Sequence, residues 1–410
     1  MNKLLFTFIL TVLIFMQSLF AQDYCTSDKY CGQSIQKNGI AIISLKGSYY
    51  DMGKQYGALE RNYIQSFYAD LTRLINFNSL KNRVVMDALS MTLPERNREI
   101  IQGMAQTSGL SYRQLLEITL STDFVFIGAD KPFTGIGCST VEAGPMYTAR
   151  GYGTLTARNY DVPKYAFNSY KNYTAITAFH PINGDNQVIT ISYIGSINAM
   201  SEINNKGLIS EINNGMLSVP GVSINKPDTL VNNFNSLFQA SSISDYNKYV
   251  KNHYPAAATN TGLASNNVVQ HYERTSHQYK IATKSPSESL DIFTNTFIDS
   301  GFKGQKYTYG PGHDSPSLTF EREDNLKSSL THLYGLININ TLENIMTKQI
   351  PNGGALAPPN NNYSIDATLF SSVYDIQNSK LYLYIPTVTK HWLTINTRKM
   401  FNSAQGAQNG

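Results

Sequence analysis

The sequence predicts a mixed α+β protein, with a helical N-terminal third followed by a body of antiparallel strands and helices. Apolar residues recur at intervals of three or four through much of residues 46–126, which is the period of a helix. After Gly137 the chain changes to short β-rich segments separated by turn residues. Helix-like segments return at 321–333 and 341–347. Helices gathered in one part of the chain and hairpin-joined strands in another are typical of the α+β class.

In the N-terminal third, a short strand at 40–45 precedes the helices. A second helix is predicted over 84–107, with a break at Pro94 and an end at Gly109. Ser111 and Gln114 have the spacing of a capping box, which predicts a further helix to about Phe124. The first helix begins after Gly47-Ser48, and its apolar face comprises Met52, Tyr56, Leu59, Tyr63, Phe67, Leu71 and Leu74.

The rest of the chain alternates between strand and helix patterns. Pro181-Ile182-Asn183-Gly184 predicts a hairpin turn, residues 230–252 and 263–283 read as helix and mixed structure, and 351–363 reads as a surface loop. Gln377-Asn378-Ser379 predicts the turn between the last two strands. Strands are predicted at 154–158, 174–179, 188–193, 207–212, 290–297, 369–375 and 380–385.

Composition limits the classes of function. The chain has 410 residues, of which 41% are hydrophobic and 15% charged, as in a globular protein of one large or two modest domains. Its net charge is +4, and no basic run is interleaved with aromatic residues, so nucleic acid is not an expected partner. The sequence has no His-Glu-x-x-His motif, no CxxC pair and no glycine-rich phosphate loop. We therefore expect neither a metal nor another cofactor.

The first 21 residues have the pattern of a secretory signal peptide. Lys3 is followed by a run from Leu4 to Met16 that is apolar except for two threonines, and Ala21 is a suitable cleavage residue. An uncleaved anchor is the alternative, but the run is short for a membrane span, and no comparable run follows. We therefore expect a secreted or periplasmic protein, or a lysosome-like location in a eukaryote, without stable membrane insertion once the signal is removed.

Three cysteines follow this segment. In an oxidising compartment Cys25 and Cys31 are expected to form a disulfide, which leaves Cys138 as an odd thiol that is either buried or functional. A thiol needs help to lose its proton at neutral pH, and Arg158 and Asp161 offer a charged pair nearby. The alternative is a buried structural cysteine beside a salt-bridged turn.

A base for this thiol can be predicted in two ways. The sequence has seven histidines, but neither they nor Cys138 have flanks like those of papain-like or caspase-like sites. If the chain is instead cut between Gly137 and Cys138, the new α-amine has a pKa near 8 and can accept the thiol proton. Gly137 suits such a cut because a residue without a Cβ tolerates a strained backbone.

The residues around Cys138 resemble the opening hairpin of the cysteine N-terminal-nucleophile hydrolases. These include the choloylglycine hydrolases and penicillin V acylases and their acid ceramidase and N-acylethanolamine amidase relatives. The resemblance covers most of residues 40–390. The N-terminal part of the chain resembles the acyl-CoA:6-aminopenicillanate acyltransferase branch. It rests on Cys138-Ser139-Thr140, Ala157-Arg158-Asn159-Tyr160-Asp161, Leu45-Lys46-Gly47-Ser48-Tyr49-Tyr50-Asp51-Met52-Gly53-Lys54-Gln55-Tyr56-Gly57, Gly103-Met104-Ala105 and Ser108-Gly109-Leu110-Ser111-Tyr112.

This resemblance implies a four-layer αββα sandwich of two antiparallel sheets, preceded by a helical pro-segment. Residues 1–21 would be the signal peptide, 22–137 the pro-segment or small subunit, and 138–410 the catalytic domain. The precursor would cut itself before Cys138 and keep the pro-segment as a partner. The hairpin is longer than in the bile-salt enzymes, and the Cys25–Cys31 region lies outside the resemblance.

The resemblance also implies roles for individual residues. Cys138 would be the nucleophile and, through its amine, the base; Arg158 would lower the thiol pKa; Asp161 would hold the amine. Asn295 would contribute to the oxyanion hole, with Asn213 or Asn214 supplying or supporting a second donor. Arg322 would be an active-site arginine. The alternatives are a turn ion pair for Arg158 and Asp161, a plain turn asparagine, and a helix-surface charge for Arg322.

The predicted function is that of a secreted, self-processing cysteine amidohydrolase. It would cleave a non-peptide C–N amide bond of a small N-acyl compound through an acyl-thioester on Cys138. Acyl transfer to an amine acceptor is the nearest competing hypothesis, because both reactions share that thioester. Two further hypotheses are a non-catalytic binding protein that keeps the fold and a peptidase with a histidine base.

Overall fold

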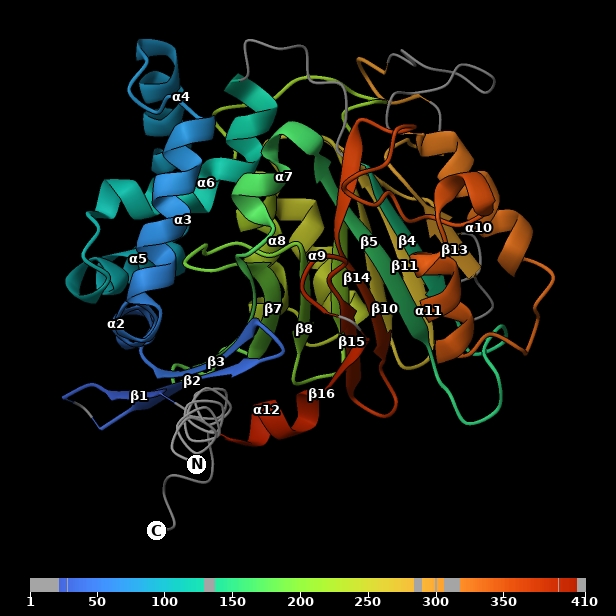
Figure 1. Ribbon diagram of the computed structural model, residues 1–410, viewed down its shortest axis with the longest axis horizontal. Coiled ribbons are helices and arrows are strands. Elements are labelled where there is room, and N and C mark those ends of the chain that lie inside the picture. The colour runs from blue at the N-terminus through green and yellow to red at the C-terminus, as the bar shows by residue number, and fades with distance from the viewer. Residues whose placement is uncertain are drawn as a thin grey trace, which may run out of the picture.

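The computed structural model describes residues 22–27, 29–128, 137–283, 290–298, 301–305, 318–389 and 391–403. The predicted signal segment, residues 1–21, lies outside them. Two β-sheets form the centre of the molecule and helices cover them (Figure 1). The protein is therefore α+β, as the sequence predicts.

The larger sheet has ten strands among the described residues, in the order β1-β2-β3-β6-β7-β8-β9-β10-β11-β12. Neighbouring strands are antiparallel except β3 and β6, which run parallel, so the expectation of two wholly antiparallel sheets is wrong at this pair. The strands are β1 (Gln22–Cys25), β2 (Cys31–Lys37), β3 (Ile40–Gly47), β6 (Thr174–Pro181), β7 (Val188–Tyr193), β8 (Ser201–Asn204), β9 (Ile209–Asn214), β10 (Thr259–Ser265), β11 (Val268–Arg274) and β12 (Tyr279–Ile281).

The smaller sheet has six described strands in the order β13-β4-β5-β14-β15-β16, all antiparallel. Every residue of β4, β5 and β14 is buried, because the larger sheet covers one face and helices cover the other. Polar residues on such strands therefore lie away from solvent. The strands are β4 (Cys138–Ala143), β5 (Leu155–Pro163), β13 (Leu290–Phe293), β14 (Asp366–Asp375), β15 (Lys380–Tyr384) and β16 (Leu393–Asn396).

Helices on the outer face of each sheet complete four layers. On the larger sheet, α8 (Thr229–Gln239) packs against β7, β8 and β9, and α9 (Ile243–Asn252) against β10. On the smaller sheet, α10 (Thr319–Leu330) packs against β4 and β13, and α11 (Ile339–Thr347) against β5 and β14. Figure 1 shows α10 and α11, in orange, at the right of the molecule.

The predicted N-terminal helices are present, in blue and cyan at the left of Figure 1. The long apolar face is divided between two helices, and Tyr63 is exposed while Ile64 is buried in its place. Pro94 separates two further helices, and Ser111 and Gln114 form the predicted capping box. The helices are α2 (Tyr49–Leu59), α3 (Arg61–Leu74), α4 (Leu80–Met91), α5 (Glu95–Thr107) and α6 (Tyr112–Gly128).

Several elements differ from the sequence prediction. The segment at 22–137 is not wholly helical, because β1 and β2 form a hairpin closed by the predicted Cys25–Cys31 disulfide. Residues 263–283 form strands, because a two-residue connection joins Ser265 of β10 to Val268 of β11 in a hairpin. Sequence patterns did not predict β8, β16, α7 (Lys164–Tyr170), α12 (Thr397–Ser403) or the short 3-10 helix η1 (Ile350–Asn352) as separate elements, whereas β4 and β5 form the hairpin predicted at Cys138.

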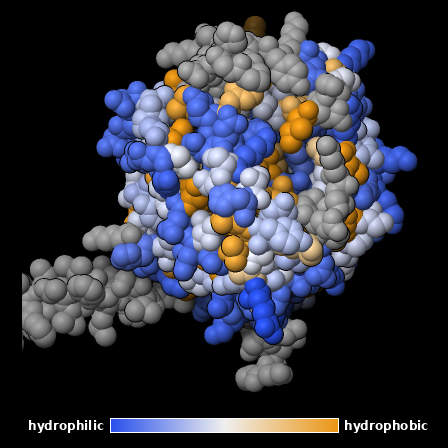
Figure 2. All heavy atoms as spheres, turned by 90° about the vertical axis from the view of Figure 1, so that its right-hand side faces the viewer, coloured by the Kyte–Doolittle hydropathy of each residue, from blue (hydrophilic) through white to orange (hydrophobic). Residues whose placement is uncertain are grey.

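The surface shows no wide apolar area on the side with α10 and α11. In Figure 2 hydrophobic residues lie there in small groups among hydrophilic ones, wherever described atoms are visible. Scattered apolar residues of this kind are normal for a folded surface. Across the described chain, none of the helices combines the length and the apolar character that a bilayer crossing requires.

Two glycines allow α2 and α5 to touch. A Cβ on Gly53 would lie 2.0 Å from the carbonyl oxygen of Ile100, and a Cβ on Gly103 would lie 2.0 Å from that of Tyr50. Both distances are far shorter than a van der Waals contact. The two helices therefore pack backbone to backbone at this crossing, which positions the N-terminal helices against the larger sheet.

This crossing yields a stability prediction. Gly103→Ala should lower the free energy of unfolding by about 1–3 kcal/mol, because the added methyl group forces the helices apart. At an open helix position the same change would instead stabilise the helix by roughly 1 kcal/mol. Urea unfolding measures the difference, with Gln102→Ala on the exposed face of α5 as the control. A Gly103→Ala protein at least as stable as the parent would contradict the close contact.

Candidate active site

The β4–β5 pair places the predicted scissile bond at the start of a buried strand. Cys138 is the first residue of β4, pairs with Tyr160 of β5, and has 1% of its surface exposed. The backbone N–H of Asp161 donates to the carbonyl oxygen of Gly137 at 2.9 Å. The Gly137–Cys138 peptide thus presents a carbonyl that already accepts a hydrogen bond.

The structure explains glycine at position 137 by space, and not by the strained backbone that was expected. Its backbone does not adopt the positive φ that would favour glycine. A Cβ there would instead lie 2.7 Å from Nη2 of Arg322 and 2.9 Å from Oδ2 of Asp366. A residue without a side chain therefore lets two charged groups approach the peptide bond before Cys138.

Arg158 lies beside the thiol. Its guanidinium is fully buried, Nη2 is 3.7 Å from Sγ of Cys138, and other N–H groups donate to the carbonyl oxygens of Met200 and Ile212. Burial raises the pKa of Cys138 above its ordinary value, and the positive charge of Arg158 opposes that rise without cancelling it. In the uncut chain the thiol is therefore neutral at pH 7, and the lowering expected from Arg158 is outweighed.

Asp161 and Arg322 form a buried ion pair across the site. Nη1 of Arg322, from α10, is 3.3 Å from Oδ2 of Asp161, and it also donates to the Ser139 hydroxyl at 2.9 Å. Burial raises the pKa of Asp161 to about 6, although Arg322 lowers it. Within the described residues, Oδ1 of Asp161 accepts no hydrogen bond. Arg322 is thus not a helix-surface charge, and residues 158–161 lie in a strand rather than in a salt-bridged turn.

Three asparagines complete the site. The Asn295 side-chain oxygen accepts from the backbone N–H of Cys138 at 2.8 Å and from Arg322, and its NH2 donates to the carbonyl oxygen of Asn214 at 3.0 Å. Asn213 donates to the carbonyl oxygens of residues 293 and 294 and accepts from Thr140. The side chain of Asn214 accepts from the Met216 N–H. Asn295 therefore contacts the Gly137–Cys138 peptide directly, whereas Asn213 contacts the neighbouring strands.

The thiol opens onto a very small pocket. Its volume of about 20 Å³ is room for roughly one water molecule. Cys138, Asn213 and Asn214 in this lining were predicted site residues, and Tyr160 lies in a motif that carries the family resemblance, but the other lining residues were not predicted. The pocket is lined by Thr122, Cys138, Tyr160, Ile212, Asn213, Asn214, Thr229, Leu230, Ala257 and Thr259.

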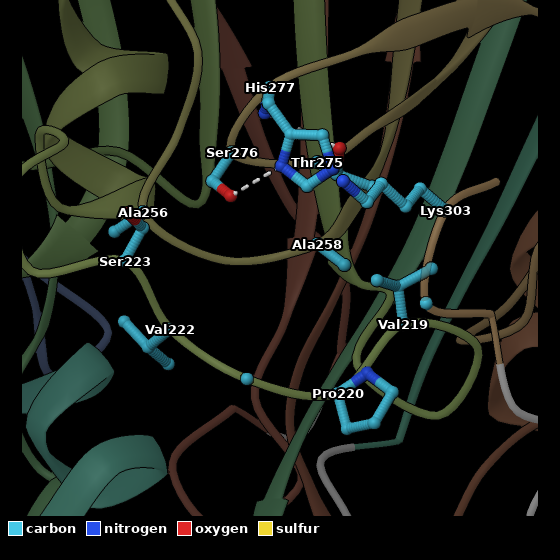
Figure 3. A pocket seen from close by; sticks show the side chains of 12 residues that line it. Val219, Pro220, Val222, Ser223, Ala256, Ala258, Thr275, Ser276, His277 and Lys303 are labelled. Carbon is cyan, nitrogen blue, oxygen red and sulfur yellow. Dashed lines mark hydrogen bonds between the residues drawn. The ribbon is translucent and has the colours of Figure 1, made fainter.

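A larger cavity of about 470 Å³ lies next to it. Ala256 and Ala258 line this cavity, whereas Ala257 and Thr259 line the pocket at the thiol, so one short segment separates the two. Figure 3 shows His277 and Lys303 together on one side of the larger cavity, with Val219 and Pro220 on another. It contains none of the predicted catalytic residues, so we place the chemistry at the smaller pocket.

Two buried carboxyl groups near the site were not predicted. Asp366 is the first residue of β14 and lies against Gly137; Glu211 lies on β9. Burial raises the pKa of each to about 7. Asp366 follows a loop-like stretch and meets Gly137 only through the pairing of β14 with β5, so no sequence spacing indicates it.

None of the described histidines contacts the thiol or lines its pocket. His180 bonds to Ser44 and His271 to Asn260, each at 3.1 Å. Burial lowers the pKa of His180 to about 4 and that of His271 to about 3. Both are neutral at pH 7, and neither is placed to take a proton from Cys138.

Comparison with known proteins gives a likeness in structure only. No family model and no curated protein matches the chain. A mutant of conjugated bile acid hydrolase from Clostridium perfringens matches with 14% identity and a TM-score of 0.39, over 64% of this chain and 94% of that one. A Caenorhabditis elegans N-acylethanolamine-hydrolyzing acid amidase ortholog matches with 15% identity and a TM-score of 0.41, over 58% and 93%. Penicillin V acylase from Agrobacterium tumefaciens matches with 13% identity and a TM-score of 0.40, over 64% and 86%. At these TM-scores the likeness carries no argument about function, which rests on the site itself.

The buried carboxyl groups predict a pH dependence of stability. Asp366 and Glu211, with a pKa of about 7, and Glu202, which burial raises to about 8, keep protons in the folded chain that the unfolded chain has released. The folded state thus binds more protons, and the free energy of unfolding should fall by roughly 2–3 kcal/mol from about pH 6.5 to pH 8. The buried His180 and His271 oppose this fall by only about 1 kcal/mol or less, because an unfolded histidine is roughly half protonated at pH 6.5 and becomes neutral, as in the folded chain, as the pH rises further.

Urea unfolding at several pH values measures this slope. Replacing Glu202 and Glu211 together by Gln should flatten it, while Glu99→Gln on α5 should not. Stability that rises over the same interval would show that these groups do not hold their protons.

Proposed function

We propose that the chain is a cysteine N-terminal-nucleophile amidohydrolase that cuts itself before Cys138 and then cleaves a small N-acyl amide. One observation carries the proposal: both sides of the Gly137–Cys138 peptide are held next to the thiol. The Gly137 oxygen accepts from the Asp161 N–H, and the Cys138 N–H donates to Asn295. A cysteine that serves only to fill the core needs neither arrangement.

Self-cleavage would begin with attack of Cys138 Sγ on the Gly137 carbonyl carbon. The Asp161 N–H would stabilise the oxyanion that forms. The C–N bond then breaks, the proton that the thiol lost passes to the nitrogen, the nitrogen leaves as the Cys138 amine, and Gly137 is left as a thioester on Sγ. Hydrolysis of that thioester releases the Gly137 carboxylate and restores the thiol.

The cut would also create the base that the precursor lacks. Before it, the Cys138 nitrogen is an amide and cannot accept a proton; after it, the amine can take the thiol proton. Two acceptors would orient that amine: the Asn295 oxygen, which already holds this nitrogen, and Oδ1 of Asp161, which has no other hydrogen bond in the described structure. Arg158 would then stabilise the thiolate at 3.7 Å.

Turnover would follow the same route with an external amide. The thiolate attacks the acyl carbon, the amine product leaves with a proton from the α-ammonium group, and water hydrolyses the acyl-thioester. Asn295, supported by Asn213, would stabilise the oxyanion once its NH2 turns from the Asn214 carbonyl. No cofactor takes part in this scheme.

The segment at 22–137 would remain with the catalytic part after cleavage. Its strand β3 pairs with β6 over seven residue pairs, and its helix α6 packs against α8. This pairing lies in the middle of the larger sheet, so separation would expose both strand edges and the apolar face between them. The segment is therefore a small subunit rather than a discarded peptide. Secretion, which the signal pattern and the disulfide favour, fits the same scheme.

Processing is tested with Cys138→Ala. The parent protein should give two fragments, one beginning at Cys138, whereas the variant should stay intact and show no amidase activity on N-acyl amide substrates. N-terminal sequencing and intact-mass analysis measure the first result. Ser276→Ala, in the larger cavity, should be cut and active like the parent. A fully active parent without a chain beginning at Cys138 would overturn the proposal and would favour a histidine-dependent peptidase.

Hydrolysis and transfer differ in their response to an amine. If water is the acceptor, adding a primary amine should leave the product acid dominant, because the pocket at Cys138 offers little room for a second substrate. A time course that follows free acid and new amide measures the ratio. Formation mainly of the new amide at millimolar amine would instead identify an acyltransferase.

A further inference from the structure

Asp366 is a buried carboxyl group that the scheme above does not use. It is 1% exposed, and neither of its carboxyl oxygens accepts a hydrogen bond of ordinary geometry from any described residue. A buried polar group without a partner is costly and calls for an explanation. The strand pairing of Asp366 with Pro163 brings the carboxyl to the end of β5, beside Gly137.

Its position relative to the scissile bond is defined by Gly137. Oδ2 of Asp366 lies 2.9 Å from where a Cβ of Gly137 would be. The carboxyl is thus on the acyl side of the bond, whereas Asn295 lies on the amine side. Asp161 is already paired with Arg322, which leaves Asp366 as the carboxyl beside Gly137 that forms no ion pair of its own among the described residues.

Nearby charged groups have opposing effects on the pKa of Asp366. Burial raises the pKa of Asp366 most, and the Asp161 carboxylate raises it further. Arg322, the nearby Gly137 backbone N–H and Lys164 lower it, and the resulting pKa is about 7. Tyr165 is a further titratable group influenced by the Asp366 charge. A base whose pKa lies near the working pH transfers protons most effectively.

We propose that Asp366 is the general base for the second half of self-cleavage, in which water hydrolyses the thioester between Gly137 and Cys138. The Asp366 carboxylate takes a proton from water as the water oxygen bonds to the Gly137 carbonyl carbon. The C–S bond then breaks, the thiolate of Cys138 accepts that proton from Asp366, and Gly137 leaves as a carboxylic acid. This assignment rests on the self-cleavage proposed above and adds a residue that acts in processing and not in the first attack.

The experiment uses Asp366→Asn, which keeps the shape of the side chain and removes the base. Freshly refolded full-length chain is followed by gel and intact mass, with and without hydroxylamine, which cleaves thioesters without a protein base. The variant should be cut at least ten-fold more slowly than the parent in buffer. Hydroxylamine should restore its cutting and leave a hydroxamate on Gly137, because the thioester still forms.

Controls separate this role from a structural one. Asp375→Asn, at the other end of β14, should be cut at the parental rate. Asp366→Ala should be slow and should recover when formate is added, as expected if a missing carboxylate is the defect; this variant decides the matter if Asp366→Asn does not fold.

The outcomes also separate this proposal from the previous one. Parental cutting of Asp366→Asn overturns the role of Asp366 and leaves self-cleavage standing. The role of Asp366 is also overturned if the variant folds, is cut slowly and is not cut faster with hydroxylamine, because the defect then lies before the thioester forms. An active parent that is never cut overturns both.

Discussion

The site depends on the guanidinium of Arg322. It donates to Ser139 on β4, to Asp161 on β5, and to Asn295 on the segment after β13, while its own helix, α10, covers the smaller sheet. One rigid, planar group thus fixes three chain segments that are distant in sequence. Without it, Asp161 would be a buried, unpaired carboxylate, and breaking such a pair typically costs about 3–5 kcal/mol. The arrangement of the Gly137–Cys138 peptide follows from this contact.

Under the proposed scheme, the chain before cleavage would have a nearly complete but inactive site. Burial keeps the Cys138 thiol protonated despite Arg158, the nitrogen that would deprotonate it is still an amide, and the pocket at the thiol has room for about one water molecule. The hydrogen bonds that hold Gly137 and Cys138 are, however, already made. In that scheme, latency would come from the chemistry of one nitrogen and from lack of space, and the positions of the surrounding side chains would not need to change much.

Sequence patterns predicted the parts of this molecule that local rules determine. The helical period, the break at Pro94 and the Ser111 capping box gave the N-terminal helices, and β-rich runs gave most of the strands. The patterns missed β1 and β2, which are short and polar, and misread β10 to β12, where a two-residue connection makes a hairpin. In the site, Cys138, Arg158 and Asp161 were predicted from the odd thiol and the charged pair near it, Asn295 and Arg322 were named from a family resemblance, and the structure brings all five together. Their catalytic roles remain predictions.

The residues that sequence reasoning missed share one property. Asp366, Tyr160 and Ile212 reach the site through strand register and sheet packing, which depend on which strands are neighbours and not on the residues beside them. A period-two pattern also gives no help on β4, β5 and β14, because both faces of these strands are buried. Polar residues on such strands were the available signal, since burying them without a purpose is unfavourable.

The parallel pairing of β3 with β6 has a consequence for how the protein can be made. It joins a strand that precedes Cys138 to one that follows it, in the middle of a single sheet. A continuous chain forms this pair as an intramolecular event. If the chain is cut before Cys138 as proposed, the two polypeptides could regain this pair after denaturation only by meeting in solution, at a rate set by their concentration and in competition with aggregation. The native arrangement would thus be reached reliably once, during the first folding of the intact chain, and lost irreversibly if the mature protein melts.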